Sequence, residues 1–144
     1  MTLAGLDQLY RQVILDAAVD PTYRGQLTNA TDAQAAHNPS CGDVLEVQAQ
    51  IRNDQIVAVA FQGSGCTISQ ASASLMAELV ANQSISSVEK AIKQFKAMIL
   101  GQEADLDQLG DAGVFSSISQ FPTRVKCAAL AWDALDELLK NQRS

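Results

Sequence analysis

The chain has 144 residues, which is enough for one domain with a single hydrophobic core. Its 47% apolar and 18% charged residues are typical of a globular protein and exclude a disordered one. A net charge of -6 argues against nucleic-acid binding, which needs a basic surface to displace phosphate counterions. We therefore expect one domain over residues 1–144 with no nucleic-acid partner.

The lengths of the apolar runs bear on the cellular location of the protein. None approaches the roughly 18 residues that span a bilayer, and no basic region followed by an apolar block opens the chain. We expect a cytoplasmic protein with no membrane partner. Its three cysteines are odd in number and widely spaced, which does not predict a disulfide framework. They are candidates for metal binding or thiol chemistry, or they are small buried hydrophobes.

The first predicted element is an amphipathic helix that ends before Pro21. Its apolar residues recur at helical spacing: Leu3, Leu6, Leu9, Val13, Ile14 and Ala17. The segment that follows is polar and is broken by Gly25 and Pro39. It predicts a loop with at most a short strand around residues 33–36.

Two strands are predicted next. Residues 45–51 alternate between apolar and polar side chains, which is typical of a strand with one face in water. Residues 55–61 form a more continuously apolar strand after a turn at Asn53 and Asp54. We expect an antiparallel hairpin, although the turn lacks the Asn-Gly or Asp-Gly pair that makes such a prediction strong.

Helices dominate the second half of the chain. A helical stripe follows the glycine turn at residues 63–65: Ile68, Ala71, Leu75, Met76, Leu79 and Val80. Ser86 and Glu89 have the form of a capping box for the next helix, which ends at Gly101.

The last part of the chain is a long loop followed by a helix. Residues 102–121 show no sustained period and predict a loop with a helical turn or two, and the final helix follows Pro122. In this order, the elements predict an α+β fold in which a small antiparallel sheet of about three strands packs against helices.

All three cysteines fall at the ends of predicted elements. Cys41 precedes a strand, Cys66 joins a strand to a helix, and Cys127 lies in the first turns of the last helix. Ligands and nucleophiles are commonly offered from such positions. Helix N-termini favour a thiolate at Cys66 and Cys127, and the neighbouring cations Arg124 and Lys126 act in the same direction.

Convergence of these cysteines would create a metal site. Asp43 would supply a fourth ligand, and three sulfurs with one oxygen suit zinc or an iron–sulfur cluster. The spacing alone is weak, because the chain has no C-x-x-C pair.

Two other chemistries are less favoured. The "GSGC" stretch resembles the start of a dinucleotide loop, but Ile68 occupies the place of the third glycine. His37 could serve as the base of a cysteine nucleophile, although a solvated loop histidine is the simpler interpretation.

Three blocks carry a family resemblance: "NPSCGD", "GSGCTISQASASLMAELV" and "FPTRVKCAALAW". In this order they resemble the U-type iron–sulfur cluster assembly proteins (IscU and NifU N-terminal-like), and especially the SufU branch. The resemblance implies a compact IscU/SufU-like α+β fold. It also implies one metal site formed by Cys41, Asp43, Cys66 and Cys127.

The branch decides the implied activity. In the scaffold branch a histidine precedes the last cysteine, and the site assembles a [2Fe–2S] cluster. Lys126 takes that place here, and the segment before Pro122 resembles the SufU insertion. SufU-like proteins bind zinc and accept persulfide sulfur from a PLP-dependent, SufS-like cysteine desulfurase on the first cysteine, here Cys41.

The chain is thus expected to be a zinc-dependent sulfurtransferase that supplies SufBCD-type assembly machinery. An iron–sulfur scaffold and a structural zinc domain are the alternatives.

The resemblance also implies roles for single residues. Cys41 would leave the metal to accept sulfur while a histidine of the partner replaces it, and the other three ligands would keep the metal. Gly42 would let the loop move, and Arg124 is a candidate for orienting or partner contact. The segment "DAAVDPTYRG" at Asp16–Gly25 departs from the family's "DHYKNPRNKG" pattern, which bears on any partner contact made through it.

Overall fold

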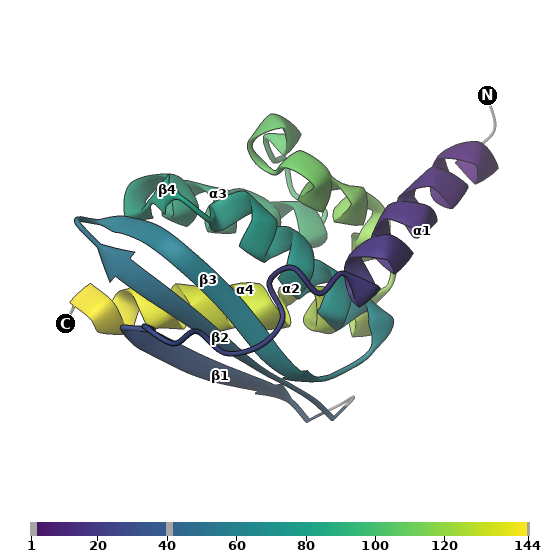
Figure 1. Ribbon diagram of the computed structural model, residues 1–144. Helices are drawn as coiled ribbons and strands as arrows, with labels where there is room; N and C mark the ends of the chain where they lie inside the picture. Colours follow the sequence, from purple (N-terminus) through teal and green to yellow (C-terminus); the bar gives the residue numbers. More distant parts are fainter. Residues whose placement is uncertain (1–2, 40–41, 144) are drawn as a thin grey trace.

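The computed structural model describes residues 3–39 and 42–143 and has the predicted α+β architecture (Figure 1). Its elements are α1 (Leu3–Val19), β1 (Asp32–Asn38), β2 (Asp43–Arg52), β3 (Gln55–Ser64), α2 (Thr67–Val80), β4 (Gln83–Ser84), α3 (Ile85–Ile99), the 3-10 helices η1 (Leu106–Gln108) and η2 (Gly110–Gln120), and α4 (Pro122–Arg143). Among the helices of these described residues, none has both the length and the apolarity needed to cross a membrane.

The sheet is antiparallel, with the strand order β1-β2-β3-β4. It has one strand more than the predicted three, because the two residues of β4 pair with Gln55 and Ile56. A strand of two residues is too short to show a period in the sequence. The weak strand predicted around residues 33–36 is the full-length β1, which pairs with β2 along its whole length.

The predicted hairpin between β2 and β3 is confirmed, and its turn explains how it forms without glycine. Asn53 and Asp54 both have positive φ, 53° and 61°. A two-residue turn with positive φ at both positions matches the twist of antiparallel strands. Asn and Asp tolerate this left-handed conformation better than other side-chain-bearing residues.

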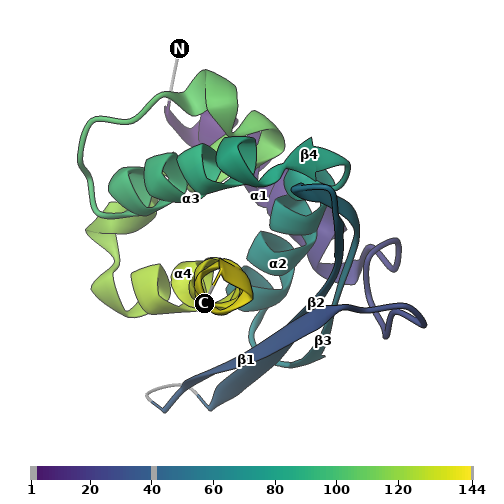
Figure 2. The same cartoon turned by 90° about the vertical axis from the view of Figure 1, so that its left-hand side faces the viewer.

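The helices form two layers on one face of the sheet (Figure 2). α2 and α4 pack directly on the strands, while α3 and η2 pack on the outer side of this helix pair and α1 packs against α2. The inward side chains of β2 and β3, which include Leu45, Val47 and Phe61, are fully buried beneath the helices. The sheet and the first helix layer therefore hold the ends of β2, α2 and α4 at fixed positions.

An aromatic cluster joins the two helix layers. The rings of Phe95 and Trp132 are stacked, with centroids 4.0 Å apart and planes 6° apart. Phe115 meets Phe95 edge-on at 6.1 Å and 77°. All three side chains are buried, so α3, η2 and α4 share one packing centre.

The segment predicted as a long loop has more structure than expected. Its buried residues are Leu109, Ala112, Phe115 and Ile118. They recur every third residue, which is the period of a 3-10 helix and places them on one face. A period of three is neither the period of 2 typical of a strand nor the 3.6 of an α-helix, so the sequence predicted only a loop with a helical turn or two. This stripe gives η2 its core contacts.

The capping box predicted at Ser86 and Glu89 is wrong. α3 begins two residues earlier than that box requires, and its N-cap is Ser84, whose backbone is extended and whose hydroxyl accepts a hydrogen bond from the Ser87 amide. Ser84 is also the last residue of β4. The strand therefore leads directly into the helix and fixes where the helix begins.

The divergent segment after α1 is fastened to the sheet and to α2. The Gly25 amide donates to the Phe61 carbonyl at 2.8 Å, and the Phe61 amide donates to the Tyr23 carbonyl at 2.9 Å. The Arg24 guanidinium lies 4.9 Å from the Phe61 ring centroid and donates to Gln70 of α2. The segment thus has its own structural contacts, and a partner contact through it stays a prediction.

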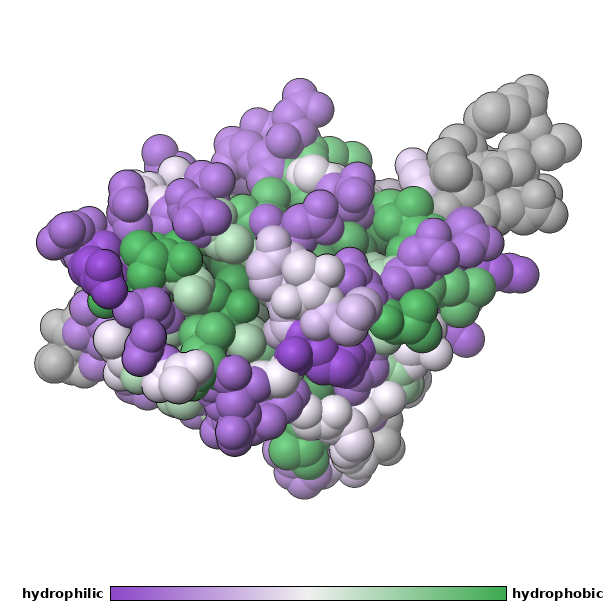
Figure 3. Space-filling view, in the orientation of Figure 1, coloured by the Kyte–Doolittle hydropathy of each residue, from purple (hydrophilic) through white to green (hydrophobic). Residues whose placement is uncertain are grey.

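The surface combines polar residues with apolar patches. Figure 3 shows the two kinds interspersed over one face of the molecule. Large apolar side chains are exposed near the ends of helices: Val19 is 76% exposed at the last residue of α1, Leu100 61% after α3 and Phe121 50% after η2. Of these, Phe121 lies at the start of α4, beside the site described below.

An ion-pair cluster links α3 to α4. Lys96 Nζ lies 2.9 Å from Asp136 Oδ2 and 3.1 Å from Asp133 Oδ1, and Lys140 also reaches Asp136 at 3.3 Å. Burial by itself would raise the pKa of Asp136, but the hydrogen bonds and charges of Lys96 and Lys140 lower it. Burial likewise opposes the charge on Lys96, yet Asp136 and Asp133 raise its pKa.

The Asp136→Asn variant should therefore unfold more easily at pH 7, by about 0.5–1 kcal/mol because these side chains are partly exposed. The stabilisation by Asp136 is complete above its unfolded-state pKa of about 3.9 and is lost as the pH falls through the lower folded-state value. Urea unfolding of both proteins between pH 7 and about pH 3 measures the effect. The difference in the free energy of unfolding between wild type and Asp136→Asn should become smaller in acid. A difference that stays constant would contradict a stabilising charge on Asp136.

Candidate metal centre

Cys66 lies between β3 and α2, where the sequence analysis placed it. It is the N-cap residue of α2, with extended backbone, and it is exposed. Its carbonyl accepts hydrogen bonds from the Ser69 hydroxyl and the Gln70 amide, both at 3.0 Å. The first turn of α2 thus holds the Cys66 backbone, while the unpaired amides and dipole of the helix N-terminus favour a negative charge there.

Cys127 lies in the second turn of α4 and is buried. Proline is well suited to a first helical turn because that turn does not need its amide hydrogen, and α4 begins at Pro122. The Cys127 thiol faces the Thr123 carbonyl one turn earlier, at 3.7 Å. The predicted position of Cys127 near the helix start is confirmed.

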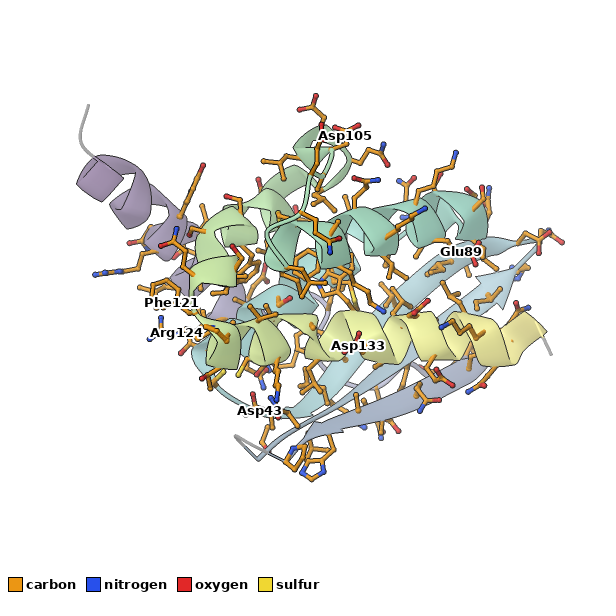
Figure 4. The ribbon with its side chains drawn as sticks, turned by 180° about the vertical axis from the view of Figure 1, so that it is seen from behind. Asp43, Glu89, Asp105, Phe121, Arg124 and Asp133 are labelled. Atoms are coloured by element: carbon orange, nitrogen blue, oxygen red, sulfur yellow. The ribbon has the colours of Figure 1, made fainter. Side chains whose placement is uncertain are left out.

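Asp43 is the first residue of β2 and is only 3% exposed. It shares the face of the strand with Leu45 and Val47, because side chains two residues apart point the same way. Its carboxylate therefore points toward the helices, and Figure 4 shows it beneath the first turns of α4. The Cys66 amide donates to Asp43 Oδ1 at 3.2 Å, and this hydrogen bond links the start of α2 to the start of β2.

These three residues form one cluster. The two sulfurs and one carboxylate oxygen all lie within 4.8 Å of one another, although they come from β2, α2 and α4. A tetrahedral zinc with bonds of about 2.0–2.3 Å spaces its ligand atoms about 3.3–3.8 Å apart, so only a small adjustment is needed. Two thiolates and a carboxylate this close would repel each other unless a cation neutralised them. The donor set fits a thiophilic divalent ion.

The remaining predicted ligand, Cys41, lies outside the described residues. The described residue next to it, Gly42, has a φ of 73° and donates its amide hydrogen to the Asn38 carbonyl at 2.8 Å. This left-handed conformation favours glycine, and it explains part of the "NPSCGD" block as a requirement of the turn between β1 and β2.

Gly65 supports the cluster by being small, a role that the sequence analysis missed. A Cβ at this position would lie 2.3 Å from Ser69 Oγ and 3.1 Å from Asp43 Cγ. Any side chain here must displace the Ser69 hydroxyl from the Cys66 carbonyl or push the Asp43 carboxylate away. The glycine therefore lets the turn before α2 approach β2.

We expect Gly65→Ala to lower the affinity for zinc by about 10- to 100-fold, as is typical when groups that orient ligands are disturbed. Gly113→Ala is the matched control, because its Cβ would approach only Leu106 Cβ, at 4.0 Å. Competition with a chromophoric chelator gives both affinities. Equal affinities for the two variants would show that the close approach at Gly65 does not matter.

Arg124 lies beside the cluster and not in it. Its side chain is exposed, and the guanidinium lies 5.5 Å from the Phe121 ring centroid. Both side chains border an open groove of about 600 Å³ that Cys66 and Cys127 also line, with apolar walls from α1, α2 and η2. This position suits the predicted role in partner contact, which stays a prediction.

His37 is exposed on β1 and, among the described residues, does not belong to the cluster. No hydrogen bond from His37 to Cys66 or Cys127 is found among the described residues, and its interpretation as a base for Cys41 stays a prediction, because Cys41 lies outside them. His37 instead borders a separate hollow that Lys126 of α4 also lines.

Comparison with known proteins places the chain among iron–sulfur assembly proteins. The family model described as "NifU-like N terminal domain" matches residues 9–140. The iron–sulfur cluster assembly scaffold protein IscU of Streptococcus pyogenes is 38% identical over 141 residues, which are 97% of this chain and 88% of that protein. The zinc-dependent sulfurtransferase SufU of Bacillus subtilis is 38% identical over 135 residues, or 93% of this chain and 91% of that protein.

A solved structure agrees with these relatives. It is a crystal structure from Fervidobacterium islandicum, described as an iron–sulfur cluster assembly scaffold protein for the SUF system. It has a TM-score of 0.87 and 33% identity, and the match covers 92% of this chain and 97% of that one.

Proposed function

Because the chain belongs to the family of NifU-like N-terminal domains, we propose that it serves iron–sulfur cluster assembly as a zinc-dependent sulfur-transfer protein. The observation that carries the proposal is the convergence of Asp43, Cys66 and Cys127 within 4.8 Å. The cluster brings two sulfur donors and one carboxylate oxygen together from three different elements, which is a donor set that suits zinc. The SufU relative, which is named as zinc-dependent, supports zinc as the ion.

The proposed ligands are the thiolates of Cys66 and Cys127, the carboxylate of Asp43 and the thiolate of Cys41. Cys41 is two residues before Asp43 in the chain, so its Cα lies within about 7 Å of the Asp43 Cα in any conformation. Zinc bound by these groups would keep the cysteines deprotonated and ready to react at neutral pH.

Cys41 is the proposed sulfur acceptor. Its thiolate attacks the outer sulfur of a persulfide on a cysteine of the desulfurase, and the bond between the two persulfide sulfurs breaks. The cysteine of the desulfurase leaves as a thiolate, and Cys41 carries the persulfide. The transfer needs no external oxidant or reductant. The donor would be a PLP-dependent, SufS-like cysteine desulfurase, and the recipient a SufBCD-type assembly complex.

The surroundings of the cluster suit an encounter with a protein donor. The groove beside Cys66 and Cys127 is open to solvent and has apolar walls, and the Arg124 side chain stands at its edge. An incoming loop could contact these walls while the cation of Arg124 attracts a persulfide anion or an acidic side chain.

A second candidate function is an IscU-type scaffold that assembles an iron–sulfur cluster and passes it on. The names of the relatives from Streptococcus pyogenes and Fervidobacterium islandicum favour it. The same thiolates could ligate such a cluster. Lys126, at the place of the scaffold branch's histidine, favours the sulfur-transfer function.

Mass spectrometry after incubation with cysteine and a PLP-dependent cysteine desulfurase tests the proposal. We expect one added sulfur atom on the peptide that contains Cys41, and none on the peptides of Cys66 and Cys127. Cys41→Ala should fold normally but accept no sulfur and give no stimulation of the desulfurase. Undiminished stimulation by this variant would refute the role of Cys41.

A further inference from the structure

Ser72 is a fully buried polar residue in the middle of α2. A serine inside a helix commonly bonds to a carbonyl of its own helix. Here the hydroxyl is committed to the neighbouring helix: it donates to the Ala128 carbonyl of α4 at 2.6 Å and accepts from Trp132 Nε1 at 3.0 Å. One hydroxyl thus joins the two helices that carry Cys66 and Cys127.

The two contacts of Ser72 restrain two kinds of movement. Ala128 and Trp132 are four residues apart, so they lie one above the other on one face of α4. Either a slide of α4 along its axis or a rotation about that axis would stretch the short bond to the Ala128 carbonyl, and the bond from the Trp132 indole adds a second contact on the same face. The hydroxyl therefore fixes both the height and the rotation of α4 against α2.

This restraint acts next to the metal centre. Ala128 directly follows Cys127, and Ser72 lies six residues after Cys66 on α2. A slip of one residue along a helix moves an atom by about 1.5 Å, whereas metal–ligand distances tolerate only about 0.2 Å. The sulfurs of the two cysteines depend on how α2 and α4 are placed, because the two residues belong to different elements.

We propose that Ser72 is a positioning residue of the metal centre, whose hydroxyl sets the place of Cys127 relative to Cys66. The inference rests on the proposed function in so far as the cluster binds zinc. Ser72 itself touches neither the metal nor the sulfur that is transferred. Its loss acts through the position of α4.

Two variants separate this role from ordinary core stability. Ser72→Ala removes both hydrogen bonds, whereas Trp132→Phe removes only the indole donor and leaves the bond to Ala128. Each loses a buried hydrogen bond, so each should unfold more easily. We expect Ser72→Ala to bind Zn²⁺ about 10-fold or more weakly, in the range found when groups that orient ligands are removed, and Trp132→Phe to stay within about 3-fold of wild type.

Chelator competition with Zn²⁺ gives these affinities, and the visible bands of bound Co²⁺ report the ligand geometry. The bands should shift in Ser72→Ala and not in Trp132→Phe. Wild-type affinity in Ser72→Ala, or an equal loss in both variants, would overturn the proposal. If Ser72→Ala does not fold, the pair Ser72→Thr and Ser72→Val replaces it, because these differ only in the hydroxyl, and Thr should bind more tightly than Val.

A metal-free measurement distinguishes failure of this inference from failure of the proposed function. In a Cys41→Ala background, oxidised glutathione converts the thiols of Cys66 and Cys127 to a disulfide and releases two glutathione thiols. The equilibrium constant reports how well the two cysteines are held together. Ser72→Ala should lower it several-fold and Trp132→Phe should not. If wild type binds no zinc yet this difference appears, only the proposed function fails; an unchanged constant refutes the inference.

Discussion

Replacing Cys127 by alanine should lower the affinity of the protein for zinc by about 100- to 1000-fold. Four-ligand zinc sites bind with about 10–16 kcal/mol, or roughly 2.5–4 kcal/mol for each ligand. Each 1.4 kcal/mol corresponds to a factor of ten. Because Cys127 is buried, water would have to enter α4's side of the site to take its place.

Chelator competition measures this loss, and circular dichroism shows whether the fold survives. Cys127→Ser is the matched control. It keeps the approximate size of the side chain and offers a weaker oxygen donor, so its affinity for zinc should lie between those of wild type and Cys127→Ala. Asp43→Ala should also weaken binding, since it removes a ligand and the acceptor for the Cys66 amide. Full zinc occupancy of Cys127→Ala at wild-type affinity would remove Cys127 from the ligand set.

The largest effect on stability is expected at the aromatic centre. Trp132→Leu should lower the free energy of unfolding by about 3–4 kcal/mol, because a fully buried ring is replaced by a smaller side chain. The variant loses the stacking on Phe95 and the hydrogen bond to Ser72. Urea unfolding at pH 7 gives the value.

Leu106→Ala provides the comparison for this experiment. Leu106 is 44% exposed in η1, so its truncation should cost less than about 1 kcal/mol. A similar cost for the two variants would show that the stacked rings do not form the packing centre that joins α3, η2 and α4.

The elements that could be predicted are those in which apolar residues recur with the period of a strand or an α-helix. The alternation at residues 45–51 and the helical stripe at residues 68–80 correspond to β2 and α2. The turn at Asn53 and Asp54 could also be placed, because both residue types accept a positive φ.

Other features depend on contacts between distant parts of the chain. The 3-10 helix η2 follows a period of three, which is typical of neither a strand nor an α-helix, and Ser84 caps α3 because β4 happens to end there. Ser72 looks like any small residue in "QASASLM", and only the approach of α4 gives its hydroxyl two partners.

The candidate site shows the same division. That Asp43 faces the helices could be predicted, since it continues the inward series of Leu45 and Val47. That Cys66 and Cys127 meet Asp43 could not, because positions 23 and 84 residues further along the chain set no distance in space. The family resemblance supplied this convergence, and the packing of α2 on α4 produces it for the three residues that the structure describes.

The metal bound by the purified wild-type protein is the most direct test of the central claim, which is a zinc site built from these residues. Elemental analysis combined with X-ray absorption at the zinc edge should find one zinc per chain, with three sulfur neighbours at about 2.3 Å and one oxygen at about 2.0 Å. Stoichiometric iron and sulfide with a visible absorption band, or zinc bound without sulfur neighbours, would contradict the account.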